Sequence, residues 1–251
     1  MWSSNGQYGE YSDFTYGVSI DSDGNPYITI TGYTGSSTNA VIPSSINVDG
    51  EDIPVKVIAD YVFYDNDTIT SVYIPSSVTT IEDYAFYSCS NLTTVTISEN
   101  SQLTTIEDYA FHSCINLTTV TISENSQLTT IGDYAFLGCL SLTSIYIPNS
   151  VTTIGQYAFR NCPNLTIVII SENSQLTTIG DYSFSYCSSL TSIYIPDSVT
   201  TIGDEAFHNC SNLTIYCEAS SEPSGWSSSW NYSNRPVVWN CTYDEYLETI
   251  A

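Results

Sequence analysis

Apolar and polar residues recur along this chain in one phrase that is copied about seven times. In the clearest copy, Val120 and Ile122 alternate with Thr119 and Thr121. This is the period of a half-exposed strand, and it is rich in β-branched residues. The pattern predicts one strand per copy, with one face turned inward and the other toward solvent.

The other half of the phrase has a longer spacing. Ile106, Ala110, Phe111 and Cys114 follow one another at intervals nearer to a helical turn, and Asp108 precedes the group. An aspartate at such a place can accept hydrogen bonds from the free amides that begin a helix. We therefore expect one short helical turn per copy, capped by its aspartate.

Neither half can close a core alone, because one strand and one turn leave an apolar face open. Stacked copies would bury that face and bring equivalent residues of neighbouring strands about 4.8 Å apart. The sequence thus predicts a curved α/β repeat solenoid with a parallel sheet. Its interior columns would be Val95, Val120, Ile145, Val168 and Ile193 on the strands and Phe86, Phe111, Phe136, Phe159, Phe184 and Phe207 opposite them.

The repeated phrase IP-x-SVTTIG-x-x-AF-x-x-C-x-x-L resembles the BspA-like leucine-rich repeats of bacterial cell-surface proteins, over residues 57–218. The resemblance implies a right-handed leucine-rich-repeat coil, with the sheet on its concave face and short helical turns and loops on its convex face. Asn100, Asn125 and Asn173 stand where such a repeat carries its asparagine, so we expect their amides to satisfy backbone groups of the turn.

One continuous domain with two capped ends is expected, because a bare terminal coil would expose apolar residues and free strand edges. Residues 1–56 are predicted to form a β-rich N-terminal cap, in which residues 27–33 alternate and residues 41–43 resemble a degenerate repeat. Residues 57–218 are the repeats. Residues 219–251, with Trp226, Trp230 and Trp239, are predicted to form an aromatic cap and a tail.

Charge narrows the choice of partners. The 251 residues include 27 acidic and only 3 Lys or Arg side chains, a net charge of −24. Such a field repels nucleic acid and anionic membranes, and no apolar run is long enough for a membrane span. The abundance of Ser, Thr, Asn and Tyr indicates an extracellular or cell-surface protein, although the first residues lack the pattern of a secretory leader.

The cysteines recur as a repeat position and not as pairs. Six of them lie 25 or 23 residues apart: Cys89, Cys114, Cys139, Cys162, Cys187 and Cys210. The His-x-Cys pairs at His112 and His208 could indicate thiol or metal chemistry, but other copies replace the histidine freely, which favours core cysteines. Cys217 and Cys241 lie outside this ladder, and either a disulfide or two separate thiols fits them.

No catalytic or phosphate-binding motif occurs, so we expect neither an enzyme nor a cofactor. Acidic residues recur at equivalent positions and could gather calcium. No copy carries a dense Asp-x-Asp-x-Asp loop, however, and capping and solvated carboxylates are expected instead.

The strand surface that faces solvent is the predicted binding face. Ile167 and Ile169 are unusual there, because alternation turns them outward while Val168 fills the core. They form either an interaction patch or ordinary packing between neighbouring strands. The candidate residues are Tyr73, Tyr146, Ile167, Ile169, Tyr194 and Tyr216.

These features favour a non-enzymatic surface or secreted scaffold that binds an extracellular protein, and the resemblance implies a role in adhesion. A glycan-binding module, with Trp226 and Trp230 as its platform, is one alternative. A structural spacer or self-assembling subunit is another. Fold alone does not decide among them.

Overall fold

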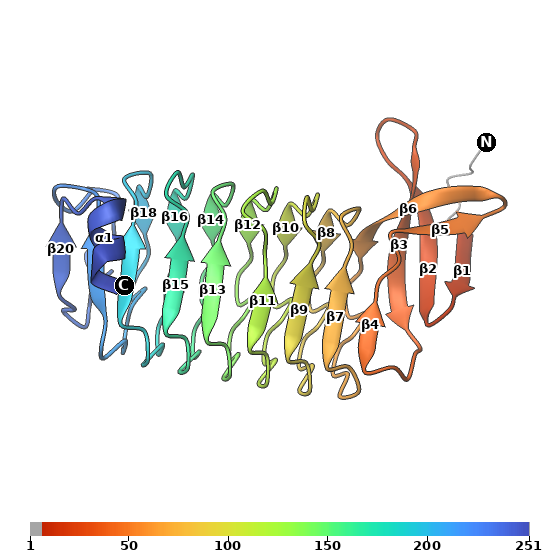
Figure 1. The fold of residues 1–251 in the computed structure, drawn as a ribbon, viewed down its shortest axis with the longest axis horizontal. Coiled ribbons are helices and arrows are strands. Elements are labelled where there is room, and N and C mark those ends of the chain that lie inside the picture. The colour runs from red at the N-terminus through yellow and green to blue at the C-terminus, as the bar shows by residue number, and fades with distance from the viewer. Residues whose placement is uncertain (1–6, 251) are drawn as a thin grey trace.

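A computed structural model describes residues 7–250 as one elongated stack of coils (Figure 1). Each repeat contributes one long strand to one face and one two-residue strand to the opposite face. The long strands form two parallel groups, β4 (Asn39–Val41), β7 (Ser71–Ile74), β9 (Thr94–Ile97) and β11 (Thr119–Thr121), then β13 (Ser144–Ile147), β15 (Ile167–Ile170), β17 (Ser192–Ile195), β19 (Thr214–Cys217) and β20 (Val237–Trp239).

The short strands form a second parallel ladder behind the first. They are β8 (Thr80–Ile81), β10 (Thr105–Ile106), β12 (Thr130–Ile131), β14 (Thr153–Ile154), β16 (Thr178–Ile179) and β18 (Thr201–Ile202). Their equivalent residues pair in register, as Thr105 does with Thr130. This ladder continues at one end into the N-terminal strands β1 (Gln7–Tyr11), β2 (Phe14–Ile20), β3 (Pro26–Tyr33) and β6 (Glu51–Ile58), with β5 (Ser45–Val48) paired to β6.

The core lies between the two ladders, and the alternating residues of the long strands fill it as predicted. Val95, Val168 and Ile193 are fully buried. The predicted phenylalanines form a continuous stack from Phe63 to Phe207, with successive ring centroids 4.7–5.8 Å apart and rings within 10° of parallel. Each coil is therefore packed chiefly against the coils on either side of it.

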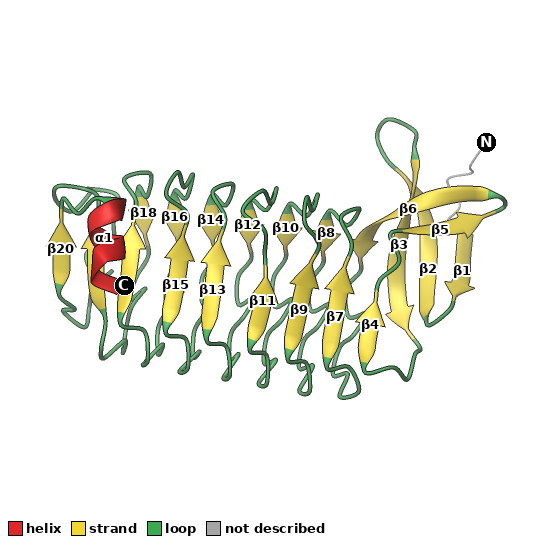
Figure 2. Ribbon diagram, in the orientation of Figure 1, coloured by secondary structure: helices red, strands yellow, loops and turns green. Residues whose placement is uncertain are grey.

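The prediction of helical turns is wrong. The segment holding Phe111 is a series of tight turns, and Figure 2 shows strands and loops throughout the repeats. Tyr109 and Ser113 both adopt positive φ, at 59° and 58°, and residues in that region interrupt a right-handed helix. The amide of Phe111 donates across to the carbonyl of Ala135 in the next coil, at 2.8 Å, rather than back along its own turn. The fold is thus an almost helix-free β-solenoid and not an α/β one.

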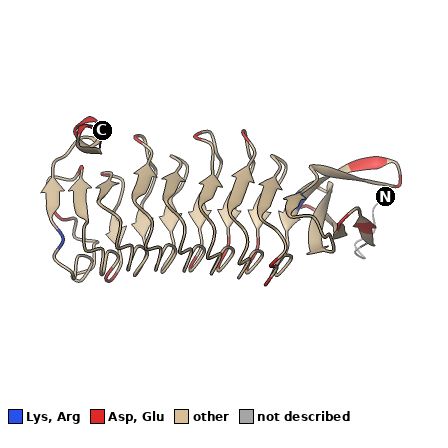
Figure 3. Cartoon of the chain, turned by 60° about the horizontal axis from the view of Figure 1, so that its bottom comes forward, with Lys and Arg blue, Asp and Glu red and all other residues tan. Residues whose placement is uncertain are grey.

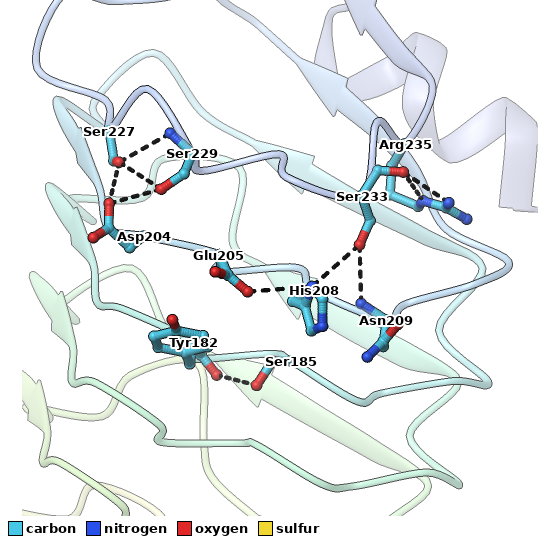
Figure 4. A network of polar contacts seen from close by, with 10 residues as sticks. All are labelled: Tyr182, Ser185, Asp204, Glu205, His208, Asn209, Ser227, Ser229, Ser233 and Arg235. Atoms are coloured by element: carbon cyan, nitrogen blue, oxygen red, sulfur yellow. Dashed lines mark hydrogen bonds and ion pairs between the residues drawn. The ribbon is translucent and has the colours of Figure 1, made fainter.

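The aspartates that precede these turns cap a neighbouring coil and not their own turn, which corrects a second expectation. The Asp83 carboxylate accepts the amide of Asp108 at 3.0 Å, and Asp108 accepts that of Asp133 at 2.7 Å. At the last coil no further repeat supplies an amide. There Asp204 accepts the hydroxyls of Ser227 and Ser229 from the C-terminal cap (Figure 4).

A third correction concerns the asparagines. Asn100, Asn125 and Asn173 lie exposed in turns. The asparagines that do bond to the backbone precede the conserved leucine of the phrase, because there the side chain points along the stack. Their Nδ2 atoms donate to carbonyls of the preceding coil, and they are Asn91, Asn116, Asn164 and Asn212.

The C-terminal segment closes the last coil. Trp226 and Trp230 are buried at its end, and the Trp226 indole donates to the Val199 carbonyl at 3.1 Å. The chain then runs through β20 and folds back as α1 (Tyr243–Ile250), the one helix within residues 7–250. The predicted tail is therefore a helix in front of the long strands (Figure 1).

Candidate ligand-binding face

The outward side chains of the long strands line one side of the solenoid across both groups of paired strands, and we call this surface the strand face. The strands pair in parallel register, so equivalent residues are neighbours: Tyr73 pairs with Thr96, and Tyr146 with Ile169. At a strand spacing of about 4.8 Å these side chains touch across strands. The repeat thus turns one position of the sequence phrase into a column along the molecule.

Most of the predicted face residues do reach solvent. Ile167 and Ile169 are 43% and 38% exposed, while Val168 and Ile170 between and beside them are buried. Tyr73 is also exposed, and Tyr146 is half-buried. The structure therefore brings Tyr146, Ile167 and Ile169 together on adjacent strands as an open apolar patch, and it places Tyr73 apart from them, near the N-terminal end.

Tyr194 is the exception, because only 1% of it is exposed. Tyr246 of α1 lies over it and over Tyr216, with ring centroids 5.5 Å and 5.4 Å away. Tyr243 meets Tyr194 edge to face at 5.2 Å. The predicted patch is thus divided: α1 covers its C-terminal part and leaves β13 and β15 open.

The position of α1 follows from its start. Thr242 and Glu245 form a capping box, in which the Glu245 carboxylate accepts the amide of Thr242 at 2.8 Å and Thr242 Oγ1 accepts the amide of Glu245 at 3.3 Å. The Thr242 amide and, at 2.9 Å, the Thr242 hydroxyl both donate to the Glu245 carboxylate and lower its pKa. The box begins the helix directly after Cys241, whose amide donates to the Cys217 carbonyl, and so directs α1 over β17 and β19.

Sequence reasoning missed two further residues in the column of outward side chains that contains Tyr73 and Tyr216. Val41 pairs with Tyr73 and is 54% exposed, and Val238 pairs with Tyr216 and is 42% exposed. For Val41 the signal was present, since residues 41–43 resemble a degenerate repeat. Val238 lies in β20, which has lost the repeat phrase and therefore gave no such signal.

The strand face is uncharged along its length. Strands β7 to β19 contain no Asp, Glu, Lys or Arg, and the acidic residues of the repeats lie in the turns at the strand ends (Figure 3). A ligand that lies along the strands would meet hydroxyls and apolar groups, with carboxylates only at the margins. Such a surface suits contacts by shape and hydrogen bonding.

The cysteines are thiols of the core, and His112 lies against a tyrosine. All eight cysteines are free and buried, so Cys217 and Cys241 are separate thiols. Cys114 Sγ donates to the Phe86 carbonyl at 3.1 Å, whereas His112 stacks on Tyr87 with ring centroids 4.7 Å apart. Burial raises the pKa of the Cys114 thiol, which opposes the thiolate that nucleophilic or metal chemistry needs.

The tryptophans and the potential metal ligands are the two other candidate features that the structure locates. Trp226 and Trp230 pack inside the cap and against one another, with ring centroids 4.8 Å apart, so neither ring offers a platform to a sugar. Within residues 7–250, no three His, Cys, Asp or Glu side chains are arranged as ligands for a metal ion. In the same range, no helix has the length and apolarity that crossing a membrane requires.

Each repeat contributes one strand, one turn and one short strand, and the repeats stack in parallel register, which defines a solenoid protein of the leucine-rich-repeat class. The sequence profile of the BspA type leucine rich repeat region matches residues 56–173 and 100–214, with six copies. The chain belongs to this family.

Solved structures give the same answer for the fold. The T. pallidum leucine-rich repeat protein TpLRR is 30% identical, with a TM-score of 0.68 over 82% of this chain and 91% of that one. A leucine-rich repeat protein from Bacteroides ovatus is 23% identical, with a TM-score of 0.61 over 92% of this chain and 70% of that one. The pneumococcal vaccine antigen PcpA is 23% identical, with a TM-score of 0.53 over 85% of this chain and 49% of that one. Comparison with curated proteins gives no match.

Proposed function

We propose that this chain is a non-enzymatic scaffold that binds an extracellular protein through the open part of its strand face. The observation that carries the proposal is the exposure of Ile167 and Ile169 on β15. Isoleucine on a solvent-facing strand position exposes apolar area; the other copies of the repeat carry Thr or Ser at the position of Ile167 and Thr or Tyr at that of Ile169. A cluster of this kind beside Tyr146 is typical of an interaction surface.

The remaining candidate residues belong to the column of outward side chains that contains Ile169. Tyr73 lies farther along the open surface on β7, whereas Tyr216 lies beneath Tyr246 of α1 and is only partly exposed. A binding surface held by parallel strands costs little ordering on association. We also propose that the protein acts at the cell surface or outside the cell, in adhesion, since the family resemblance and the acidic, hydroxyl-rich composition favour this setting.

The test is a binding measurement on single-site variants against immobilised extracellular-matrix proteins. Ile167→Asp places a charge at the centre of the patch without touching the core, and we expect it to weaken binding at least tenfold. Thr119→Asp is the matched control, since Thr119 occupies the same strand position on β11. If both variants bind as the unmodified chain does, the patch is not the binding site.

A further inference from the structure

A groove of about 540 Å³ lies beside the strand face, where the turns that follow β11, β13 and β15 approach the beginning of α1. Parallel strands end at the same edge of a sheet, so these three turns present their side chains side by side. The groove is lined chiefly by Tyr146, Tyr243, Glu124, Glu172, Asn149 and Asn173. Its volume is within the range of small-ligand sites, about 300–1,000 Å³.

The polar groups of the groove are free to bind a ligand. Within residues 7–250, no side-chain hydrogen bond is made by Asn149, Asn173, Glu124 or Glu172. By contrast, the side-chain amides of Asn116 and its equivalents donate to backbone carbonyls of the preceding coil. Each free asparagine offers two N–H donors and a carbonyl acceptor, and each carboxylate offers acceptors only.

Two tyrosine rings supply the apolar part. Tyr146 projects from β13, and Tyr243 is held at the start of α1 by its edge-to-face contact with Tyr194. Burial raises the pKa of Tyr243, and the neighbouring Tyr146, Tyr246, Glu172 and Glu124 raise it further. A ligand in the groove would meet aromatic rings and hydrogen-bonding groups at the same time.

We propose that this groove binds a neutral saccharide. The tyrosine rings would stack against the C–H faces of a pyranose, while Asn149, Asn173 and the two glutamates would bond to its hydroxyls. A sugar hydroxyl both donates and accepts, which matches the mixture of amides and carboxylates. A basic peptide is the competing occupant, because its cations would pair with the glutamates and its backbone carbonyls would accept from the asparagine N–H groups, and the test therefore includes one. Acidic sugars are repelled by Glu124, Glu172 and the net charge of −24.

This site overlaps the proposed protein-binding patch at Tyr146 and Ile169, and the two are distinguished by the residues that only one of them contains. Ile167 does not line the groove, and Glu172 lies in a turn and not on the strand face. Ile167→Asp should therefore weaken protein binding and leave saccharide binding unchanged. Glu172→Ala should do the reverse, so failure of one proposal leaves the other intact.

The experiment is a glycan array with neutral and acidic members and a lysine-rich peptide as a further probe, followed by calorimetric titration of the strongest neutral binder. Glu172→Ala and Tyr146→Ala should each weaken that saccharide about tenfold. The matched controls are Glu99→Ala, which changes the same turn position after β9, and Tyr73→Ala, which changes the same column on β7.

Binding lost in the groove variants and kept in the controls supports the proposal. The proposal is overturned if no neutral saccharide binds saturably at millimolar concentration, if the lysine-rich peptide binds in place of the sugars, or if the controls lose binding equally. Circular dichroism of each variant separates loss of the site from loss of the fold.

Discussion

The ring of Tyr246 on α1 lies 5.5 Å from the ring of Tyr194 on β17, centroid to centroid, and both side chains are buried by the contact. Residues 52 positions apart in the chain thus meet on the outside of the sheet. This contact forms the small second core of the protein, together with Cys241 and the partly buried Tyr216 and Tyr243. It decides how much of the strand face is open to a ligand.

Tyr246→Ala should release α1 from the sheet. An eight-residue helix is unstable in water by itself, since isolated helices below about 12 residues are marginal. Removing the ring that anchors it should therefore abolish hydrogen-exchange protection in residues 243–250 and leave the repeats protected, as mass spectrometry of peptic fragments would report. Leu247→Ala, at an exposed position of the same helix, is the control and should change little. Retained protection in Tyr246→Ala would mean that other contacts hold α1.

Phe136→Ala should be the most destabilising type of substitution in the repeats. Phe136 is fully buried between Phe111 and Phe159, with centroids 5.2 Å from each. Deleting its ring leaves a cavity that neighbouring coils cannot fill, at a cost of about 3–5 kcal/mol. Urea unfolding measures this cost. Thr121→Ala, exposed on the strand of the preceding coil, should stay within about 0.5 kcal/mol of the unmodified chain, and equal effects would show that the stack does not carry the stability.

The strands and the core could be predicted because their signal is local and repeated. Val120 and Ile122 alternate with threonines, and only a strand places such residues on one face. The turns could not be identified in the same way. The spacing of Ile106, Ala110 and Phe111 fits a helix and a series of tight turns equally, and the difference lies in whether the amide of Phe111 bonds within its own coil or to Ala135.

The candidate site was predictable only in part for a similar reason. Alternation placed Ile167 and Ile169 outward, and the structure agrees. Nothing in the period of the repeat could indicate that Tyr194 is covered, because the covering helix follows the repeats. The capping box at Thr242 and Glu245 was the available signal for that helix, but its docking depends on ring contacts that have no sequence pattern.

The repeat cysteines should resist alkylation in the folded protein. Cys139 Sγ donates to the Phe111 carbonyl at 3.2 Å in a fully buried site, and burial raises the pKa of this thiol well above its ordinary value. Because the thiolate is the reactive form, iodoacetamide at pH 8 should modify none of the six ladder positions until a denaturant is added. Intact-mass measurement with and without guanidinium makes the comparison, and rapid native modification would contradict the structural role of these thiols.

Replacing Glu107 should stabilise the protein at neutral pH. Burial raises the pKa of Glu107, and the charges of Asp83, Asp108, Glu82 and Asp60 raise it further. A carboxyl whose pKa is higher in the folded chain favours the folded state when protonated. Its contribution is therefore fully present below the unfolded value of 4.5 and is lost as the pH rises through the raised folded value.

Glu107→Gln keeps the side chain neutral at every pH, so we expect a higher Tm at pH 7, by an amount equivalent to less than about 1 kcal/mol because the group is partly solvated. The gain should shrink as the pH falls toward 4, where the native glutamate is itself protonated. Asp204 has the opposite behaviour, since the Ser227 and Ser229 hydroxyls lower its pKa and acid weakens that contact. The stability of the whole chain therefore includes contributions that increase and contributions that decrease as the pH falls. The difference in Tm between Glu107→Gln and the unmodified chain, followed from pH 7 to pH 4, isolates the acidic cluster, with Glu124→Gln as a control for net charge. A lower Tm for Glu107→Gln at pH 7 would show that the carboxylates of this cluster are held by contacts stronger than their mutual repulsion.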